Sequence, residues 1–274
     1  MYKLSLQKLY CIAFANSKTR KRYLRIIVIT FEKLKLRFIS SPAFHIVSLN
    51  ENALLLSYGN IIDVSINNKI IALHQILAAQ PFPGMIETVP AYASLVIFYD
   101  VVLIRKLPSG FTTAFDFVKN YVLQLSNEIN ERVNSNYKNT IAIPVYYNGE
   151  DLEYVSGLHQ ISIERVVQIH TAITYQVFMN GFLPGFAYMG TVDERIVTPR
   201  KEQPRVTVPA GSVGIAGAQT GIYPLDSPGG WQLLGKTPLK IFDINKKNPC
   251  LIKAGDLVQF VSINKTEFEK LNEY

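Results

Sequence analysis

The hydrophobic positions between residues 38 and 148 follow two different periods. Apolar runs with a period of two predict short strands, at residues 44–49, 53–58, 85–89, 94–99 and 141–147. Two intervening segments repeat their apolar residues every three to four positions, which predicts a helix after the N-cap Asp63 and another from Thr112 to Arg132. This β-β-α-β-β-α-β order predicts a small α+β sandwich with both helices on one face of a sheet.

From residue 149 the pattern changes to many short strands separated by glycine and proline turns. One short helix, Ser162–His170 with Ser162 as its N-cap, precedes most of them. The remaining strands are predicted at residues 175–180, 205–209, 214–216, 232–234, 239–242 and 257–263. Such a series predicts a β-barrel or sandwich. The chain therefore divides into an α+β domain at residues 38–148 and a β-barrel domain at residues 149–274.

The positive charge is confined to one end of the chain. The net charge is +7, and residues 1–37 hold ten basic residues and one acidic residue, so the rest carries −2. Residues 38–274 therefore lack the net positive charge that is typical of a nucleic-acid-binding domain. Residues 1–37 are interpreted as a disordered basic extension, and their apolar run at residues 24–31 is too short to span a bilayer. We expect neither nucleic acid nor a membrane as a partner.

Cysteine and histidine usage argues against a metal or disulfide framework. The two cysteines, Cys11 and Cys250, are too few for a disulfide scaffold or a structural zinc site. The four histidines show no HxH or HxxxH spacing. The sequence thus predicts no protein-held metal centre and a cytoplasmic location.

Residues 181–238 stand apart because glycines alternate there with polar residues and the only tryptophan, Trp231. Glycine lets the backbone approach a ligand and lets successive amides converge on an anion, whereas tight barrel turns are the simpler explanation. The segment lacks the Gly-Lys-Ser/Thr of a phosphate-binding P-loop and the GxSxG of a serine hydrolase. The polar residues favour a catalytic or binding site over simple turns.

The same segment carries a family resemblance. The runs GFLPGFAYMG (181–190), TPR (198–200) and PRVTVPAGSVGIAGAQTGIYPLDSPGGWQLLGKTP (204–238) resemble the KipI family, as does VPAYASLVIFYD (89–100). That family includes the B subunit of 5-oxoprolinase and the allophanate hydrolase subunit 1-like domain. The likeness covers nearly all of residues 40–265, with small departures at Ala187 and Thr191. It implies a ferredoxin-like N-terminal domain and a cyclophilin-like β-barrel C-terminal domain.

The resemblance also implies an activity. Such proteins open the lactam 5-oxo-L-proline to L-glutamate with ATP, and with Mg²⁺, in a complex with subunits A and C. By their chemistry, Arg200 and Arg205 would bind phosphate or the substrate carboxylate, and Asp226 or Asp193 would hold magnesium or act as the base. The candidates for binding phosphate through backbone amides or neighbouring polar groups are Gly211, Ser212, Gly214 and Gly217. The side chains that would orient the substrate are those of His170, Gln219 and Tyr223.

Simpler roles exist for several of these residues. Asp193 could be a turn residue, His170 could cap its own helix, and Tyr223 could be barrel packing. Two other functions also stay open. The chain could be a KipI-type inhibitor that docks on a sensor histidine kinase, or a component of an allophanate or urea-amide hydrolase.

Overall fold

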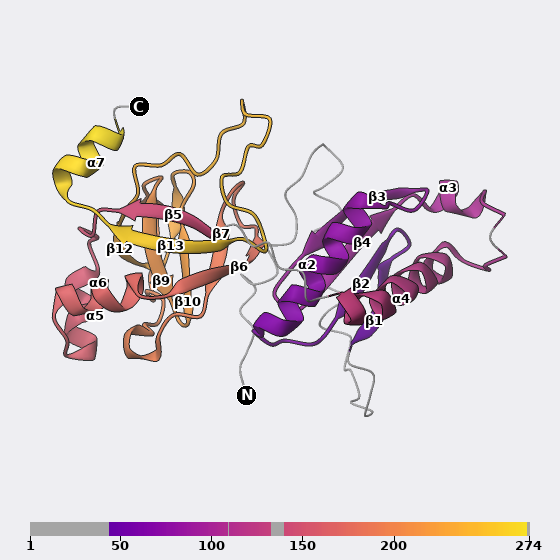
Figure 1. Cartoon of the computed structure of the whole chain (residues 1–274), viewed down its shortest axis with the longest axis horizontal. Coiled ribbons are helices and arrows are strands. Elements are labelled where there is room, and N and C mark those ends of the chain that lie inside the picture. The colour runs from indigo at the N-terminus through magenta and orange to yellow at the C-terminus, as the bar shows by residue number, and fades with distance from the viewer. Residues whose placement is uncertain (1–43, 109, 133–139, 273–274) are drawn as a thin grey trace. The chain divides into compact units, whose positions relative to one another are not determined.

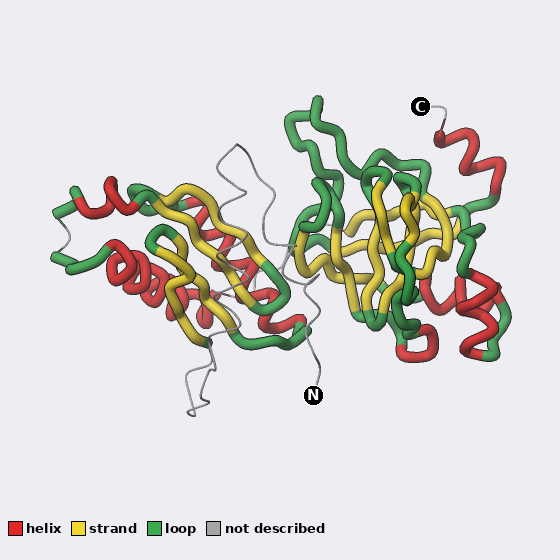
Figure 2. Tube along the Cα trace, turned by 180° about the vertical axis from the view of Figure 1, so that it is seen from behind, coloured by secondary structure: helices red, strands yellow, loops and turns green. Residues whose placement is uncertain are grey.

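The computed structural model describes residues 44–108, 110–132 and 140–272, so the basic extension predicted at residues 1–37 lies outside the described residues. The chain forms two compact units, Met1–Tyr137 and Lys138–Tyr274 (Figure 1). Secondary structure in both units is shown in Figure 2, in which loops make up much of the second unit.

The first unit is a four-stranded antiparallel sheet with helices packed on one face. The strand order is β1-β2-β4-β3. Apolar residues of β2 and β4 meet the inward faces of α2 and α4 in a single core cluster. The elements are β1 (His45–Asn50), β2 (Ala53–Ser57), α2 (Val64–Ala79), β3 (Met85–Pro90), β4 (Ser94–Tyr99), α3 (Val101–Arg105) and α4 (Ala114–Arg132).

These elements follow the sequence pattern closely, including the predicted N-cap. The Asp63 carboxylate accepts a hydrogen bond of 2.9 Å from the Ile66 amide, which begins α2 as expected. The short helix α3 is an element that the sequence pattern does not predict. The ferredoxin-like description is not confirmed, because that motif runs β-α-β-β-α-β, whereas this unit runs β-β-α-β-β-α.

The fifth strand predicted for the first domain belongs to the second unit instead. Strand β5 (Thr140–Val145) pairs in parallel with β13 (Leu257–Ser262) over its whole length. The units therefore separate after Tyr137, about ten residues before the boundary expected at residue 148. Sequence order alone placed this strand in the first domain, because β5 is the next element after α4. Its partner β13 lies more than a hundred residues later in the chain.

The second unit is a seven-stranded sheet that nearly closes into a barrel. Its strand order is β12-β9-β10-β7-β6-β13-β5. The additional elements are α5 (Leu152–His159), α6 (Ile163–Thr171), β6 (Thr174–Asn180), β7 (Ala187–Gly190), η3 (Glu194–Ile196), β8 (Arg205–Val208), β9 (Ser212–Ala216), β10 (Gln219–Ile222), β11 (Ser227–Gly229), β12 (Gln232–Lys236) and α7 (Lys265–Asn272). The predicted strand at residues 239–242 is absent from the described chain, where only an isolated bridge joins Phe242 to Cys250.

The segment after β5 closes the barrel. Tyr146 and Lys236 exchange two backbone hydrogen bonds of 2.9 Å, and the Gly149 amide donates to the Leu234 carbonyl at 3.0 Å. This segment thus connects the edge strand β5 to the opposite edge strand, β12. Closure removes the free edges that an open sheet would leave. A β-barrel was expected; the more specific cyclophilin-like description stays a prediction.

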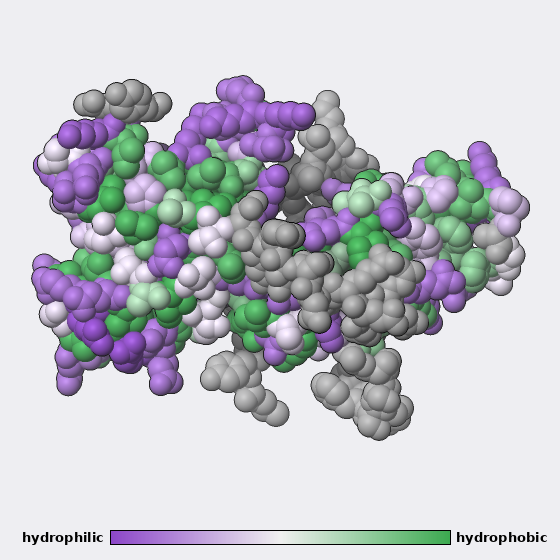
Figure 3. Space-filling model, viewed as in Figure 1, coloured by the Kyte–Doolittle hydropathy of each residue, from purple (hydrophilic) through white to green (hydrophobic). Residues whose placement is uncertain are grey.

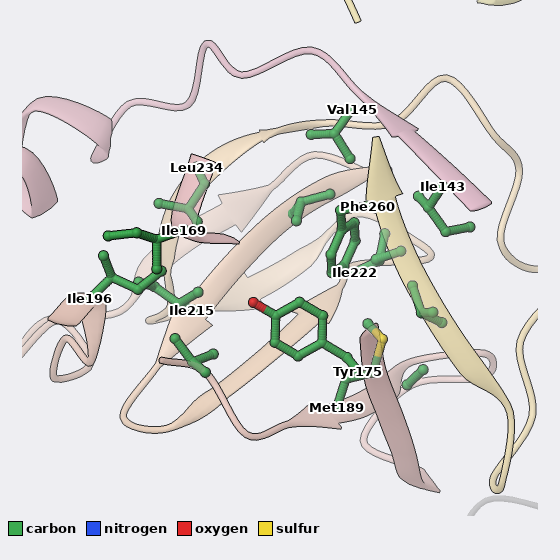
Figure 4. Packing of buried hydrophobic residues seen from close by; sticks show 14 of the residues in the cluster. Ile143, Val145, Ile169, Tyr175, Met189, Ile196, Ile215, Ile222, Leu234 and Phe260 are labelled. Atoms are coloured by element: carbon green, nitrogen blue, oxygen red, sulfur yellow. The ribbon is translucent and has the colours of Figure 1, made fainter. Parts of the chain in front are cut away.

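The barrel interior is a packed apolar core. Side chains alternate along the strands, so Val213 and Ile215 of β9 point inward while Gly214 and Ala216 point outward. Figure 4 shows the inward-facing residues converging from the strands, from α6 and from η3. Hydrophilic residues cover much of the visible outer surface of α5 and α6 (Figure 3). The interior is therefore filled and does not form an open channel through the barrel.

Barrel closure at Gly149 leaves no room for a side chain. A Cβ at this position would lie 2.2 Å from the Leu233 carbonyl oxygen, which belongs to backbone. We therefore expect Gly149→Ala to lower the free energy of unfolding by about 1–3 kcal/mol, as overpacking does. Thermal or denaturant unfolding measures this. The control is Gly157→Ala, because Gly157 in α5 has open space around it and should gain about 0.5–1 kcal/mol. Equal stabilities of the two variants would contradict this account.

Candidate functional site

Asp151 is the centre of a buried polar network in the second unit. Its carboxylate accepts hydrogen bonds from the Leu233 amide at 2.7 Å, from Lys201 Nζ at 3.0 Å and from the Arg205 guanidinium. The side chain of Asp151 is 5% exposed. Burial alone would raise the pKa of Asp151, but the Leu233 amide, Arg205 and Lys201 together hold it below its usual value. Asp151 is therefore ionised and joins three separate chain segments.

Arg205 is held by this network. Besides Asp151, its guanidinium donates to Glu150 Oε2 at 3.0 Å and to the Trp231 carbonyl at 3.1 Å. Its side chain is 14% exposed. These bonds occupy three of the five N–H donors of the guanidinium. The structure thus places Arg205 in a buried ion-pair network, and phosphate binding by Arg205 stays a prediction.

His170 lies inside the barrel rather than at a surface site. Its Nδ1 is 2.7 Å from the Tyr147 hydroxyl and its Nε2 is 2.9 Å from Thr220 Oγ1. Thr220 in turn donates to the Gly214 carbonyl, so it accepts from Nε2–H, and Nδ1 accepts from Tyr147. The ring stacks on Phe260 with centroids 4.6 Å apart. Complete burial lowers the pKa of His170 to about 3, which keeps it neutral.

The predicted phosphate cradle is occupied by the protein's own carbonyls. The Gly211 amide donates to the Tyr223 carbonyl and the Gly217 amide to the Thr198 carbonyl, both at 2.7 Å. Gly214 lies within β9, between Gly221 of β10 and Leu233 of β12. The segment is an extended strand, not a phosphate loop, so its amides do not converge on an anion. Phosphate binding by these residues stays a prediction, and the amides of Gly211 and Gly217 would have to exchange their present partners to take part in it.

The glycines instead make room for an aromatic layer on the outside of the sheet. A Cβ on Gly221 would lie 3.0 Å from Trp231 Cζ3, and one on Gly229 would lie 2.4 Å from the Tyr223 hydroxyl. Trp231 and Phe186 meet edge to face with centroids 5.4 Å apart. Tyr223 is buried in this layer, which raises its pKa. In the structure, Tyr223 and Trp231 thus pack in the aromatic layer.

The candidate residues do not all converge. Gly211 and Ser212 lie where β9 begins, and Asp226 joins them there by accepting a hydrogen bond of 2.7 Å from the Ala210 amide. Gly217 and Gln219 lie at the other end of β9, about 13 Å away for a strand of this length. The candidates therefore fall into two groups at opposite ends of one hairpin.

Asp193 lies near the second group, because the amide of the preceding residue donates to the Ala218 carbonyl at 2.9 Å. The Asp193 carboxylate caps η3 through the Arg195 amide at 3.0 Å and pairs with the Arg195 guanidinium at 2.7 Å. Hydrogen bonds from Arg195 lower the pKa of Asp193 to about 2. Arg200 is exposed, and its charge acts on Tyr223. Asp193 therefore fulfils the turn role, while Arg200 lies on the loop that carries Lys201.

Magnesium binding by this chain stays a prediction. No group of three His, Cys, Asp or Glu side chains in the described ranges could hold a metal ion. Asp193 and Asp226, the two carboxylates suggested as ligands, each have a local hydrogen-bonding role. Because Mg²⁺ is usually held by only one or two carboxylates together with the phosphates of a nucleotide, such a site would form with the bound nucleotide.

The polar features that sequence reasoning missed lie around the loop at residues 199–204. The Asp151 network anchors this loop through Lys201, and Gln232 of β12 donates from Nε2 to the Pro199 carbonyl at 2.9 Å. In the sequence, Gln232 belongs to a predicted strand and to the family motif at residues 204–238, and Asp151 begins the run DLE, which also resembles the family, but neither residue is marked there as a member of a polar network. Partners 33 and 50 residues apart in sequence leave no local pattern that would reveal them.

The sequence of this chain matches a known family. The model of the carboxyltransferase domain, subdomain C and D, matches residues 44–252. Because the match spans both units, the chain belongs to this family.

Individual relatives show which members of this family the chain is similar to. The chain is 44% identical to the B subunit of 5-oxoprolinase from Bacillus subtilis over 84% of this chain and 97% of that protein. It is 24% identical to urea amidolyase of Lachancea kluyveri over 85% of this chain, but only 14% of that protein. Among solved structures, TTHA0988 matches 77% of this chain with a TM-score of 0.65 and 35% identity. The chain spans 40% of the length of TTHA0988.

Proposed function

We propose that this chain is the B subunit of an ATP-dependent 5-oxoprolinase that opens 5-oxo-L-proline to L-glutamate together with subunits A and C. The observation that carries the proposal is the 44% identity to the B subunit of a bacterial 5-oxoprolinase over nearly all of that protein. Since that relative is one subunit of an enzyme, further subunits are implied. None of the helices in the described ranges combines the length and apolar character needed to cross a membrane. The cytoplasm is the proposed location.

The division of labour within the complex follows from the bond that is broken. A five-membered lactam is a resonance-stabilised amide, so its opening requires activation, positioning and charge stabilisation together. The described residues of this chain offer a rigid barrel and a buried polar centre at Asp151, but the amides that the sequence suggested for phosphate are engaged. We therefore propose that ATP and Mg²⁺ act in the assembled complex, and that this chain contributes to binding the lactam.

The complex should be active where the separate chain is not. We expect the purified chain to turn over 5-oxoproline at least about a hundredfold more slowly than the complex with subunits A and C, since positioning contributes several kcal/mol. The measurement is glutamate formation and 5-oxoproline-dependent ATP hydrolysis after co-expression. Each subunit is omitted in turn as a control. Rapid turnover by the chain alone, or none by the complete complex, would overturn the proposal.

The same preparation tests the other functions. Allophanate and urea replace 5-oxoproline in parallel assays, because an allophanate or urea-amide hydrolase component would act on those amides. Autophosphorylation of a sensor histidine kinase with and without the chain tests the KipI-type inhibitor role. Activity confined to 5-oxoproline supports the proposed function.

A further inference from the structure

Two buried polar groups without partners lie in one short segment of the second unit. Within the described residues, four side chains bury a polar atom with no hydrogen-bond partner: Asn52, Tyr99, Ser227 and Gln232. The last two lie only five positions apart, and their exposures are 7% and 3%. Leaving a buried polar atom unsatisfied costs about 1–3 kcal/mol. Such groups call for an explanation, and a ligand that completes the hydrogen bonding supplies one.

The side chain of Gln232 is the more informative of the two. Its Nε2 donates to the Pro199 carbonyl at 2.9 Å, which fixes the carboxamide, while its Oε1 accepts from no group. Pro199 begins a loop that continues to Pro204 without regular structure and is largely exposed. This loop, residues 199–204, contacts Gln232 through Pro199. Displacing it would release the Gln232 Nε2 that donates to Pro199.

One cationic side chain of the same loop, that of Lys201, lies near the part of β12 that carries Gln232. The Lys201 amide donates to the Gly230 carbonyl at 2.8 Å, two residues before Gln232. The Lys201 ammonium contacts Asp151, whose other oxygen accepts from the Leu233 amide, next to Gln232. An ammonium has three donors, and Asp151 takes one. A carboxylate on a ligand bound to Gln232 therefore has a positive charge nearby.

We infer that Gln232 is the lactam-recognition residue of this subunit and that loop 199–204 closes over the bound substrate. The inference rests on the proposed function. A lactam is a cis amide, so its N–H and C=O point to the same side. A primary carboxamide presents the complementary donor and acceptor: Gln232 Oε1 accepts from the ring N–H, and Nε2 donates to the ring carbonyl. The substrate carboxylate, one carbon from the ring nitrogen, binds Lys201.

The test compares Gln232→Met with the unmutated protein in the complete complex. Methionine keeps the length of the side chain and removes both polar atoms. We expect the KM for 5-oxoproline to rise at least tenfold, because a site built to hydrogen-bond a polar ligand discriminates strongly. Titration calorimetry with 5-oxoproline should show the same loss of affinity. L-proline, which has the ring and the carboxylate without the amide carbonyl, should bind weakly to both proteins.

Tyr99→Phe is the matched control, because it also removes a buried polar atom without a partner, from the first unit. It should leave the KM unchanged. An unchanged KM and affinity in Gln232→Met, in a complex that turns over 5-oxoproline, overturns the inference and leaves the proposed function standing. A complete complex that neither binds nor turns over 5-oxoproline overturns both. If Gln232→Met does not fold, Gln232→Glu, which keeps the shape and loses the donor, replaces it and should raise the KM in the same way.

Discussion

Replacing His170 by glutamine should remove a pH-dependent part of the stability of the second unit. In the folded protein burial lowers the pKa of His170 to about 3, against about 6.5 in an unfolded chain. The unfolded state therefore binds the proton more readily. The stabilisation is fully present above pH 6.5 and is lost as the pH falls toward 3, at about 1.4 kcal/mol for each pH unit.

The measurement is denaturant unfolding of the unmutated protein and His170→Gln between pH 7.5 and about 5.5, an interval in which ordinary carboxylates stay largely ionised. At pH 7.5 the variant should be less stable by roughly 3 kcal/mol, because it loses two buried hydrogen bonds and the ring stack on Phe260. Its stability should then fall less steeply with decreasing pH than that of the unmutated protein.

Two other histidines serve as controls for this comparison. Burial also lowers the pKa of His74, which lies in the first unit, so His74→Gln separates the contribution of that unit. His159 is only half-buried and makes one hydrogen bond, to Thr198, so His159→Gln at pH 7.5 should lower the free energy of unfolding much less than His170→Gln does. Identical pH slopes for the unmutated protein and His170→Gln would show that His170 is not neutral and buried as described.

Removing either side of the Asp151–Arg205 pair should destabilise the second unit strongly. Asp151 and Arg205 have side-chain exposures of 5% and 14%, so each variant leaves a largely buried charge without its main partner. Breaking such a pair from one side costs about 3–5 kcal/mol. We expect Asp151→Ala and Arg205→Ala each to lose this much on unfolding by denaturant. The double variant should lose less than the sum of the two.

The exposed pair between Asp193 and Arg195 provides the control, since Arg195→Ala should have little effect on stability. Turnover of the reconstituted complex is measured for the same variants. An Arg205→Ala protein that unfolds like the unmutated chain but has lost turnover would restore the phosphate-binding interpretation of Arg205 and contradict the structural one. Loss of stability with retained turnover of the folded fraction would support the network.

Much of the first unit could be predicted from sequence because its signals are local. The strand pattern at residues 94–99 and the N-cap Asp63 depend on neighbouring residues only, and both are confirmed. The helix with the N-cap Ser162 is confirmed for the same reason. The family could also be recognised, because the motif at residues 204–238 is nearly continuous.

The site could be predicted only as a region. The segment at residues 181–238 does contribute to the polar centre and to the aromatic layer. The sequence could not distinguish glycines that bind an anion from glycines that admit an aromatic ring. Gly221 belongs to the second kind only because Trp231, ten residues later, folds back across it. Such an assignment requires the register of β9, β10 and β12.

The sequence by itself determined most helices and strands of the first unit, that the chain changes from α+β to barrel near its middle, and the family. Only the tertiary structure decided that β5 pairs with β13, that Arg205 is held by Asp151, and that His170 lies inside the barrel on Thr220. The physical reason is distance along the chain. Periodicity and caps are set by energies between neighbouring residues, whereas these contacts join residues at least 50 positions apart and form only when the closed barrel brings them together.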